Sequence, residues 1–299
     1  MNENVTTPQH FPFHLMAKPT GPACNLACTY CFYLEKEHFF PDDETYRMSE
    51  EVLEAYIMKY IVTNPSPEVA FAWQGGEPTM MGVDFFRYAV ELQQRYADGK
   101  RITNSLQTNG VLIDEEWAAF LRENNFLIGL SLDGPPDIHD SFRVDRAGNP
   151  SSPKVLRALE LLKEHNVEFN TLTCVTRQNS RRPLDVYTFL RDNGVKFMQF
   201  IPIVERLPDS EAKEMGIDHA VPPDFGEEPE SKHVTPWSVE PRRFGDFLNT
   251  MFDYWVRRDV GEVFVQHFDV ALGHWYGMPS TLCLFGRQCG NALIIEHNG

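Results

Sequence analysis

Gly21-Pro-Ala-Cys24-Asn-Leu-Ala-Cys28-Thr-Tyr-Cys31 is the stretch that decides the fold, because it places three of the chain's six cysteines within eight residues. The spacing is C-x3-C-x2-C, and an apolar run that we expect to form a strand, residues 14–19, directly precedes it. In a long chain with no export signal, clustered cysteines hold metal or do chemistry more often than they form disulfides. The sequence therefore predicts a metal or cluster site in the loop after the first strand.

Three cysteines at this spacing fit an iron–sulfur cubane with one open iron, because each of its four irons needs a ligand. An open iron can chelate the amino and carboxylate groups of a small molecule and pass one electron into its sulfonium. Two other interpretations remain, namely three buried cysteines or a zinc site that lacks a ligand. Zinc sites usually combine two C-x2-C pairs, and Cys174, Cys283 and Cys289 do not have the spacing of a second pair.

The composition narrows the class of protein. The 299 residues include 27 basic and 43 acidic side chains, giving a net charge of −16, which disfavours a nucleic-acid partner. No apolar run approaches the length of a membrane span, so no membrane partner is expected. Residues 1–14 lack the basic head and apolar middle of a signal peptide, which predicts a cytoplasmic protein.

Strand and helix patterns alternate along most of the chain and predict an α/β fold with a parallel sheet. Such a sheet closes into a full or partial barrel or stays open, and in each case function gathers after the carboxyl ends of the strands. The expected strands are residues 14–19, 68–73, 101–106, 127–132, 168–175 and 196–203. The expected helices are residues 49–63, 83–96, 114–124, 153–165, 182–193 and 241–258.

These patterns divide the chain into four parts. Residues 1–12 form an N-terminal extension, and residues 13–204 form the core barrel. Residues 205–238, rich in Pro, Glu and Asp, are expected to form a surface insertion or linker. Residues 239–299 contain a helix and a last segment with two cysteines.

The cysteine loop resembles the signature of the radical SAM superfamily, and the resemblance covers residues 13–204. It implies a partial (β/α)6 TIM-like barrel with a 4Fe-4S cluster on Cys24, Cys28 and Cys31. It also implies that the cluster reductively cleaves S-adenosylmethionine (SAM) to a 5′-deoxyadenosyl radical. Tyr30, the aromatic residue before the third cysteine, corresponds to a position near the adenine.

The resemblance recurs at the ends of later strands. Gln74-Gly-Gly-Glu-Pro78 matches the family's GGEP segment, which binds the amino group of SAM; an ammonium needs acceptors, and glycine lets backbone carbonyls come close. By themselves these stretches also fit a plain turn, a strand end and a surface arginine. The SAM contacts that the resemblance implies are Gly75, Gly76 and Glu77 for the amino group, Ser131 with Asp133 for the ribose, Arg143 for the carboxylate and Val204 for the adenine.

The last segment resembles the opening of a SPASM domain, which carries auxiliary 4Fe-4S clusters, and Cys283 and Cys289 would bind one of them. The form C-x5-C-G, together with Lys18-Pro-Thr-Gly21 and Cys31-Phe-Tyr-Leu-Glu35, is similar to the anaerobic sulfatase-maturating enzymes. That family oxidises a Cys or Ser of a sulfatase, in the motif Cys/Ser-x-Pro-x-Arg, to Cα-formylglycine. A flavodoxin or ferredoxin is the expected reductant.

In the mechanism that the resemblance implies, the radical removes a hydrogen from Cβ of the target and a base removes the thiol or hydroxyl proton. The auxiliary cluster accepts the second electron. The family's catalytic Asp and further cysteines would lie beyond Gly299, so we expect a fragment and assign no catalytic residue. Two cysteines cannot hold a whole cluster; the expected outcome is one intact cluster and 5′-deoxyadenosine, with little formylglycine.

Two rival functions fit part of the same pattern. One is another SPASM-type enzyme that crosslinks or epimerises a peptide, which would share the SAM site. The other is a non-catalytic metal-binding regulatory protein, which would bind zinc instead of iron. Cys174, inside an expected strand, is interpreted as a buried apolar residue without a role.

Overall fold

The computed structural model describes residues 12–40, 45–220, 233–280, 282, 285–286 and 292–299. Cys283 and Cys289, and most of the N-terminal extension, lie outside the described residues. Within the described ranges, no helix combines the length and the apolar character that crossing a membrane requires.

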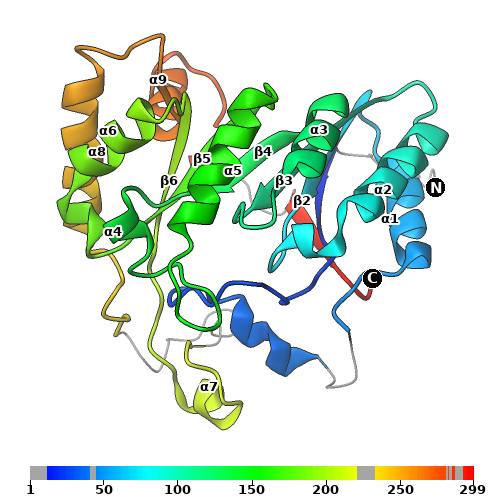
Figure 1. Ribbon diagram of the computed structural model, residues 1–299, viewed down its shortest axis with the longest axis horizontal. Coiled ribbons are helices and arrows are strands. Elements are labelled where there is room, and N and C mark those ends of the chain that lie inside the picture. The colour runs from blue at the N-terminus through cyan, green and yellow to red at the C-terminus, as the bar shows by residue number, and fades with distance from the viewer. Residues whose placement is uncertain (1–11, 41–44, 221–232, 281, 283–284, 287–291) are drawn as a thin grey trace, which may run out of the picture.

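One parallel sheet of eight strands runs through the described part of the molecule, in the order β7-β6-β5-β4-β3-β2-β1-β8. The helices that connect consecutive strands lie along its outer face, as in a partial TIM-like barrel (Figure 1). The strands are β1 (His14–Lys18), β2 (Glu68–Trp73), β3 (Arg101–Thr108), β4 (Leu127–Ser131), β5 (Phe169–Val175), β6 (Phe197–Pro202), β7 (Phe264–Val265) and β8 (Ala292–Glu296).

The predicted α/β barrel is confirmed, and every strand and helix expected from the sequence is present, with ends that differ by at most three residues. The α-helices are α1 (Glu50–Thr63), α2 (Val83–Tyr96), α3 (Glu115–Glu123), α4 (Pro136–His139), α5 (Ser152–Glu164), α6 (Pro183–Asp192), α7 (Ser210–Glu214), α8 (Pro241–Trp255) and α9 (Gln266–Trp275). The 3-10 helices are η1 (Leu34–Phe39), η2 (Pro78–Met81) and η3 (Asn179–Arg181).

The core lies between the outer face of the sheet and its helices. Trp73 on β2 packs edge-on against Tyr56 of α1 and Phe86 of α2, with ring centroids 5.8 and 5.4 Å apart. The Trp73 indole N–H donates a 2.9 Å hydrogen bond to Asn104 Oδ1, which satisfies a polar group that burial would otherwise leave unpaired. Because the helices anchor this face of the sheet, the strand ends form a fixed platform for the loops.

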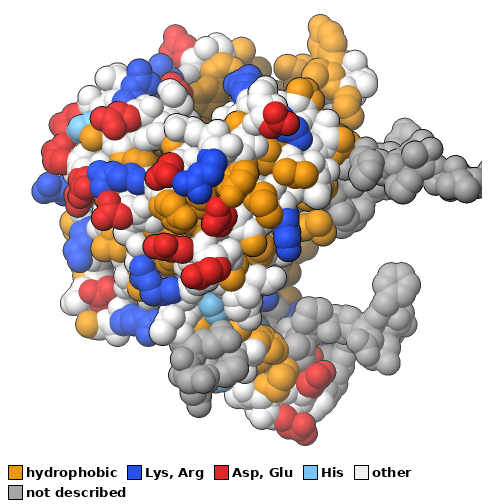
Figure 2. Space-filling model, turned by 90° about the vertical axis from the view of Figure 1, so that its right-hand side faces the viewer, with side chains coloured by type: hydrophobic (Ala, Val, Ile, Leu, Met, Phe, Trp, Pro, Cys, Tyr) orange, Lys and Arg blue, Asp and Glu red, His pale blue; other side chains and the backbone are white. Residues whose placement is uncertain are grey.

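The outer helices carry charges of both signs on their solvent side. Figure 2, which shows the side of α1 and α2, has acidic and basic side chains interspersed rather than gathered by sign. On α2, Arg87 pairs with Asp84 at 2.6 Å and Arg95 pairs with Glu91 at 3.0 Å, spacings that helical neighbours favour. No continuous basic area covers this face, in agreement with the acidic composition.

The described part of residues 205–238 folds back onto the segment that follows the cysteine loop. Thr235 N–H donates to Glu205 O at 2.8 Å and joins the two ends of this stretch. His219 Nδ1 lies 2.9 Å from Glu35 Oε2, so the stretch is anchored to η1. The connection places α7 on the side of the molecule where the cysteine loop lies (Figure 1).

Candidate active site

The cysteine loop leaves β1 at the carboxyl end of the sheet and is held from two sides. On one side, Ala27 N–H donates to Val144 O at 2.8 Å, and Thr29 N–H donates to Phe142 O at 3.0 Å. On the other side, Gly76 N–H donates to Gly21 O at 2.8 Å. Backbone groups of the segments that follow β2 and β4 therefore hold in place a loop that has little regular structure of its own.

The two glycines after β2 let the cysteine loop approach. A Cβ on Gly76 would lie 2.0 Å from Ala23 O, and a Cβ on Gly75 would lie 3.3 Å from Gly21 O. Gly75 also has a φ of +136°, which side-chain-bearing residues rarely adopt. Both positions therefore need glycine because the cysteine loop packs directly against them. The sequence pattern alone did not indicate this reason.

The three thiols are half-buried and free. Burial raises the pKa of Cys24 to about 11 and that of Cys28 to about 12, so both are protonated at neutral pH until a metal displaces the proton. Leu26 N–H and Asn109 Nδ2 both donate to Cys24 Sγ, at 3.4 and 3.7 Å. These donors are aimed at the sulfur and would stabilise its thiolate form.

This donor set fits an iron–sulfur cubane better than a zinc ion. Among the residues that the structure describes, no three His, Cys, Asp or Glu side chains converge closely enough to hold a single metal ion. A cubane does not need such convergence, because each thiolate binds its own iron. Cys24, Cys28 and Cys31 lie within one loop of eight residues, as the three ligands of one cluster can.

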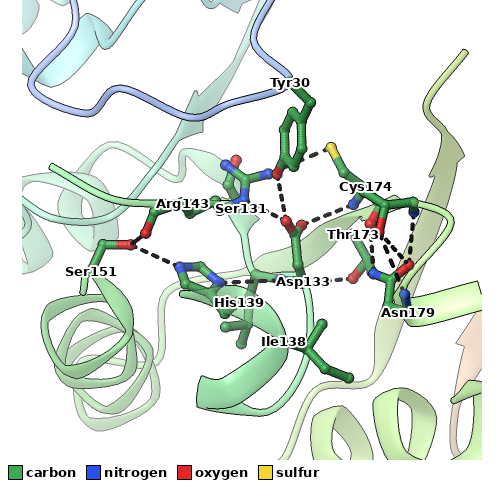
Figure 3. A network of polar contacts seen from close by, with 12 residues as sticks. Tyr30, Ser131, Asp133, Ile138, His139, Arg143, Ser151, Thr173, Cys174 and Asn179 are labelled. Carbon is green, nitrogen blue, oxygen red and sulfur yellow. Dashed lines mark hydrogen bonds and ion pairs between the residues drawn. The ribbon is translucent and has the colours of Figure 1, made fainter. Parts of the chain in front are cut away.

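Asp133, just after β4, is the centre of a buried polar network (Figure 3). Its Oδ2 accepts hydrogen bonds from the Tyr30 hydroxyl and from Arg143 Nε, the latter at 2.9 Å. Its Oδ1 accepts the Cys174 N–H at 2.9 Å. One carboxylate therefore connects the cysteine loop, the segment after α4 and β5.

Arg143 is only 7% exposed, and its charge is compensated within the network. Burial alone would lower the pKa of its guanidinium, but Asp133 beside it holds that pKa above the usual range. Nη2 donates to Cys174 Sγ at 3.6 Å. Among the described residues no protein group hydrogen-bonds to Nη1, so the N–H groups of this nitrogen can donate to a ligand.

His139 supports this network through hydrogen bonds to the Asp133 backbone and to Ser151. Its Nδ1 accepts the Asp133 N–H at 3.2 Å, and its Nε2 lies 3.0 Å from Ser151 Oγ, which donates to Arg143 O at 2.7 Å. Burial lowers the pKa of His139 to about 4. The ring is therefore neutral at pH 7, with its proton on Nε2, and it fixes the turn that carries Asp133 and Arg143.

Comparison with known proteins matches this arrangement to one family. The model of the radical SAM superfamily matches residues 19–190. A serine-type anaerobic sulfatase-maturating enzyme of Bacteroides thetaiotaomicron is 40% identical over the whole of this chain and 70% of its own length. The chain belongs to the anaerobic sulfatase-maturating enzymes of the radical SAM superfamily.

Further relatives and solved structures agree with this membership. A cysteine-type anaerobic sulfatase-maturating enzyme of Clostridium perfringens is 36% identical over 96% of this chain and 73% of its own. A structure of anSMEcpe with bound AdoMet superimposes with a TM-score of 0.79 over 96% of this chain and 72% of that one, at 36% identity. The chain spans 65% of the length of a serine-type relative from Klebsiella aerogenes. HemN from Escherichia coli, at 12% identity and a TM-score of 0.58, shares the fold.

In this radical SAM chain the GGEP carboxylate is fully enclosed. Glu77 is 1% exposed, and its Oε1 accepts hydrogen bonds from Thr79 N, Thr79 Oγ1 and Thr108 Oγ1 at 2.6–3.0 Å. Oε2 accepts the Asn109 N–H at 2.7 Å. Burial raises the pKa of Glu77, although these hydrogen bonds oppose the rise. The residue thus ties the end of β2 to the end of β3, and its contact with a SAM ammonium stays a prediction.

The positions expected to contact the ribose and the adenine lie at the ends of β4 and β6. Ser131 Oγ accepts a 3.1 Å hydrogen bond from Gln107 Nε2, and Gly129 leaves room for that amide, since a Cβ there would lie 2.1 Å from Gln107 Oε1. Val204 follows the end of β6 and is 56% exposed. Asp133 already serves three protein donors. The ribose and adenine contacts therefore remain predictions.

Several residues of this site were not singled out from the sequence. Asn109 is the middle residue of Thr108-Asn-Gly110, where β3 ends. Polar residues at a strand end are a signal that could have identified it. His139 lies four residues before Arg143, but a buried neutral histidine has no local signature in the sequence. Cys174 lies in β5, as expected, but its N–H and its sulfur both hydrogen-bond within the Asp133 network, so it does not pack as a purely apolar residue.

Proposed function

We propose that the full-length protein oxidises an active-site Cys or Ser of a sulfatase polypeptide, in the motif Cys/Ser-x-Pro-x-Arg, to Cα-formylglycine, and that this chain supplies the part that binds and cleaves SAM. The observation that carries the proposal is its 40% identity to a serine-type maturating enzyme over the entire chain. The site supports it, because the cysteine loop is fixed against Gly76 and beside the Asp133 network, where a radical SAM enzyme needs its cofactor. A structure of anSMEcpe with a bound peptide matches this chain with a TM-score of 0.74.

Cys24, Cys28 and Cys31 would hold the 4Fe-4S cluster. When bound, the cluster and SAM supply a 5′-deoxyadenosyl radical by reductive cleavage of the sulfonium. The chain's own residues bind and orient SAM. Among the described residues no protein group donates to the carbonyls of Gly75 and Gly76, so these carbonyls can accept from the SAM ammonium.

The remaining SAM contacts follow from the same geometry. The Nη1 N–H groups of Arg143 suit the SAM carboxylate, because a guanidinium forms strong charge-assisted hydrogen bonds with a carboxylate. Ser131 would bind the ribose with Asp133 behind it, and Tyr30 and Val204 would contact the adenine. Burial raises the pKa of Tyr30 well above its usual value, so its hydroxyl stays protonated and keeps its bond to Asp133.

The proposal also covers an auxiliary cluster, an electron donor and a cellular compartment. Cys283 and Cys289 would provide ligands to an auxiliary 4Fe-4S cluster, and a flavodoxin or ferredoxin would supply electrons. The cytoplasm is the proposed compartment, because free cysteines persist in reducing surroundings.

The test is a peptide assay. The anaerobically reconstituted full-length protein is incubated with SAM, a reductant and matched peptides that carry Cys-x-Pro-x-Arg or Ser-x-Pro-x-Arg, and mass spectrometry follows conversion to formylglycine. Product that disappears in Cys28→Ala supports the proposal. No product from either peptide, with modification of an unrelated precursor peptide, would favour a crosslinking or epimerising enzyme instead.

A further inference from the structure

Lys18 is a buried cation that the proposed chemistry does not use. It is the last residue of β1, six residues before Cys24, and only 9% of it is exposed. Its Nζ lies 3.6 Å above the centre of the Tyr33 ring. Among the described residues no acceptor hydrogen-bonds to this ammonium and no carboxylate forms an ion pair with it. Burying such a charge is costly unless something negative is placed nearby.

Two segments, the one that carries Tyr33 and strand β8, hold the Lys18 ammonium in place. Tyr33 follows Cys31 by two residues and fixes the position of the ring below Nζ. The Tyr33 hydroxyl donates to Glu296 Oε2 at 2.6 Å, and Glu296 lies opposite Lys18 in the pairing of β1 with β8. The ring cannot turn away without breaking that bond. Lys18 is therefore confined beside the loop that carries Cys31.

One of the groups that act electrostatically on Lys18 belongs to the cysteine loop. Burial lowers its pKa, Glu296 and Cys31 raise it, and Lys36 lowers it. Glu296 already accepts the hydrogen bond from Tyr33 and does not pair directly with Nζ. Cys31 is the other group that raises the pKa of Lys18, and its sulfur would carry a negative charge as a ligand of the cluster.

We propose that Lys18 is a positioning residue for the cluster, whose ammonium, held over Tyr33, stabilises the negative charge of the reduced cluster bound through Cys31 and so raises its reduction potential. The inference rests on the proposed cluster at Cys24, Cys28 and Cys31. The potentials of iron–sulfur clusters depend on nearby charge and on solvent exposure. Lys18 is only 9% exposed, so less water screens its charge than that of a lysine on the open surface. Lys18 itself transfers neither electron nor proton; the external reductant supplies the electron.

The test measures the cluster's midpoint potential by electron paramagnetic resonance during an anaerobic redox titration. Lys18→Met and Lys18→Gln remove the charge and keep much of the length, whereas Lys18→Arg keeps the charge. The expected result is a shift to more negative potential in the two neutral variants and little shift in the arginine variant. Lys36→Met is the matched control, since Lys36 lies 5.5 Å from the same ring but is partly exposed, and its loss should shift the potential less.

The outcomes separate the explanations. A neutral variant with full iron content and an unchanged midpoint would overturn the proposal. If both neutral variants lose iron while Lys18→Arg retains it, the requirement for charge supports the proposal; loss of iron in all three would show a requirement for shape and overturn it. No peptide is present in the titration, so failure to form formylglycine would leave this result unaffected.

Discussion

Asp133 shows how one side chain organises the site at the scale of single residues. Its two oxygens bind Tyr30, Arg143 and the Cys174 N–H, so the cysteine loop and β5 depend on the same carboxylate. The sequence could indicate Asp133 because it follows a strand end. It could not indicate the partners, because Tyr30 and Cys174 come from distant parts of the chain and are joined only by the fold.

Replacing Asp133 with Asn should destabilise the protein by about 3 kcal/mol, because the buried guanidinium of Arg143 loses its counter-charge. Urea denaturation of the two proteins measures the difference. Asp185→Asn is the control: Asp185 pairs with Arg182 on the surface at 2.7 Å, with 55% of its side chain exposed, and its loss should cost much less. Equal losses in the two variants would contradict the role given to Asp133.

Gly76→Ala should displace the cysteine loop, because the added Cβ would lie 2.0 Å from Ala23 O. We expect a loss of stability of about 1–3 kcal/mol, as for other overpacked sites, and a clear fall in iron bound after anaerobic reconstitution. Gly245→Ala, in α8, adds the same methyl group where nothing lies within 4 Å, and it should bind as much iron as the parent protein. Normal iron binding by Gly76→Ala would refute the packing argument.

His139 should make stability depend on pH. Its pKa is about 4 in the folded protein and near 6.5 when unfolded. Above pH 6.5 both states are neutral; as the pH falls, the unfolded state takes up the proton first, and folding loses stability down to pH 4. This residue should account for a loss of about 2 kcal/mol between pH 7 and pH 5. Urea denaturation at both pH values should show a smaller loss for His139→Gln; an equal loss would contradict the assignment.

At the scale of elements, local patterns predicted the strands and helices of residues 13–204 well, because each element carries its own apolar period and its own start signal. α1 is an example: Ser49 caps it, and its buried residues recur at helical spacing. β8 and α9 were not predicted. β8 joins the sheet only by pairing with β1 from the other end of the chain, and its exposed Leu293 and Ile294 give no alternating pattern.

Ser49→Ala should destabilise α1, because Ser49 Oγ accepts the Val52 N–H at 3.3 Å at the start of the helix. The expected loss in the free energy of unfolding is about 1 kcal/mol. Ser49→Asp keeps a capping oxygen and should retain most of the stability. Calorimetry of the three proteins gives the comparison, and an alanine variant as stable as the parent would show that the cap is not needed.

At the scale of the whole molecule, the sheet separates stability from chemistry. The aromatic core lies on its outer face with the helices, whereas the cysteine loop, the glycines after β2 and the Asp133 network meet at the carboxyl ends of the strands. The sequence predicted this division, because its polar glycine-containing stretches follow the strands. It could not predict how tightly the loops interlock, since hydrogen bonds such as Gly76 N–H to Gly21 O join separate loops.

The cluster at the cysteine loop underlies every proposed step of the chemistry, and the most direct measurement of its function is the formation of 5′-deoxyadenosine. The anaerobically reconstituted protein, given SAM and a strong reductant, is predicted to release 5′-deoxyadenosine and methionine, and Cys28→Ala is predicted to release neither. Protein that binds iron and sulfide at this loop but leaves SAM intact would contradict the account.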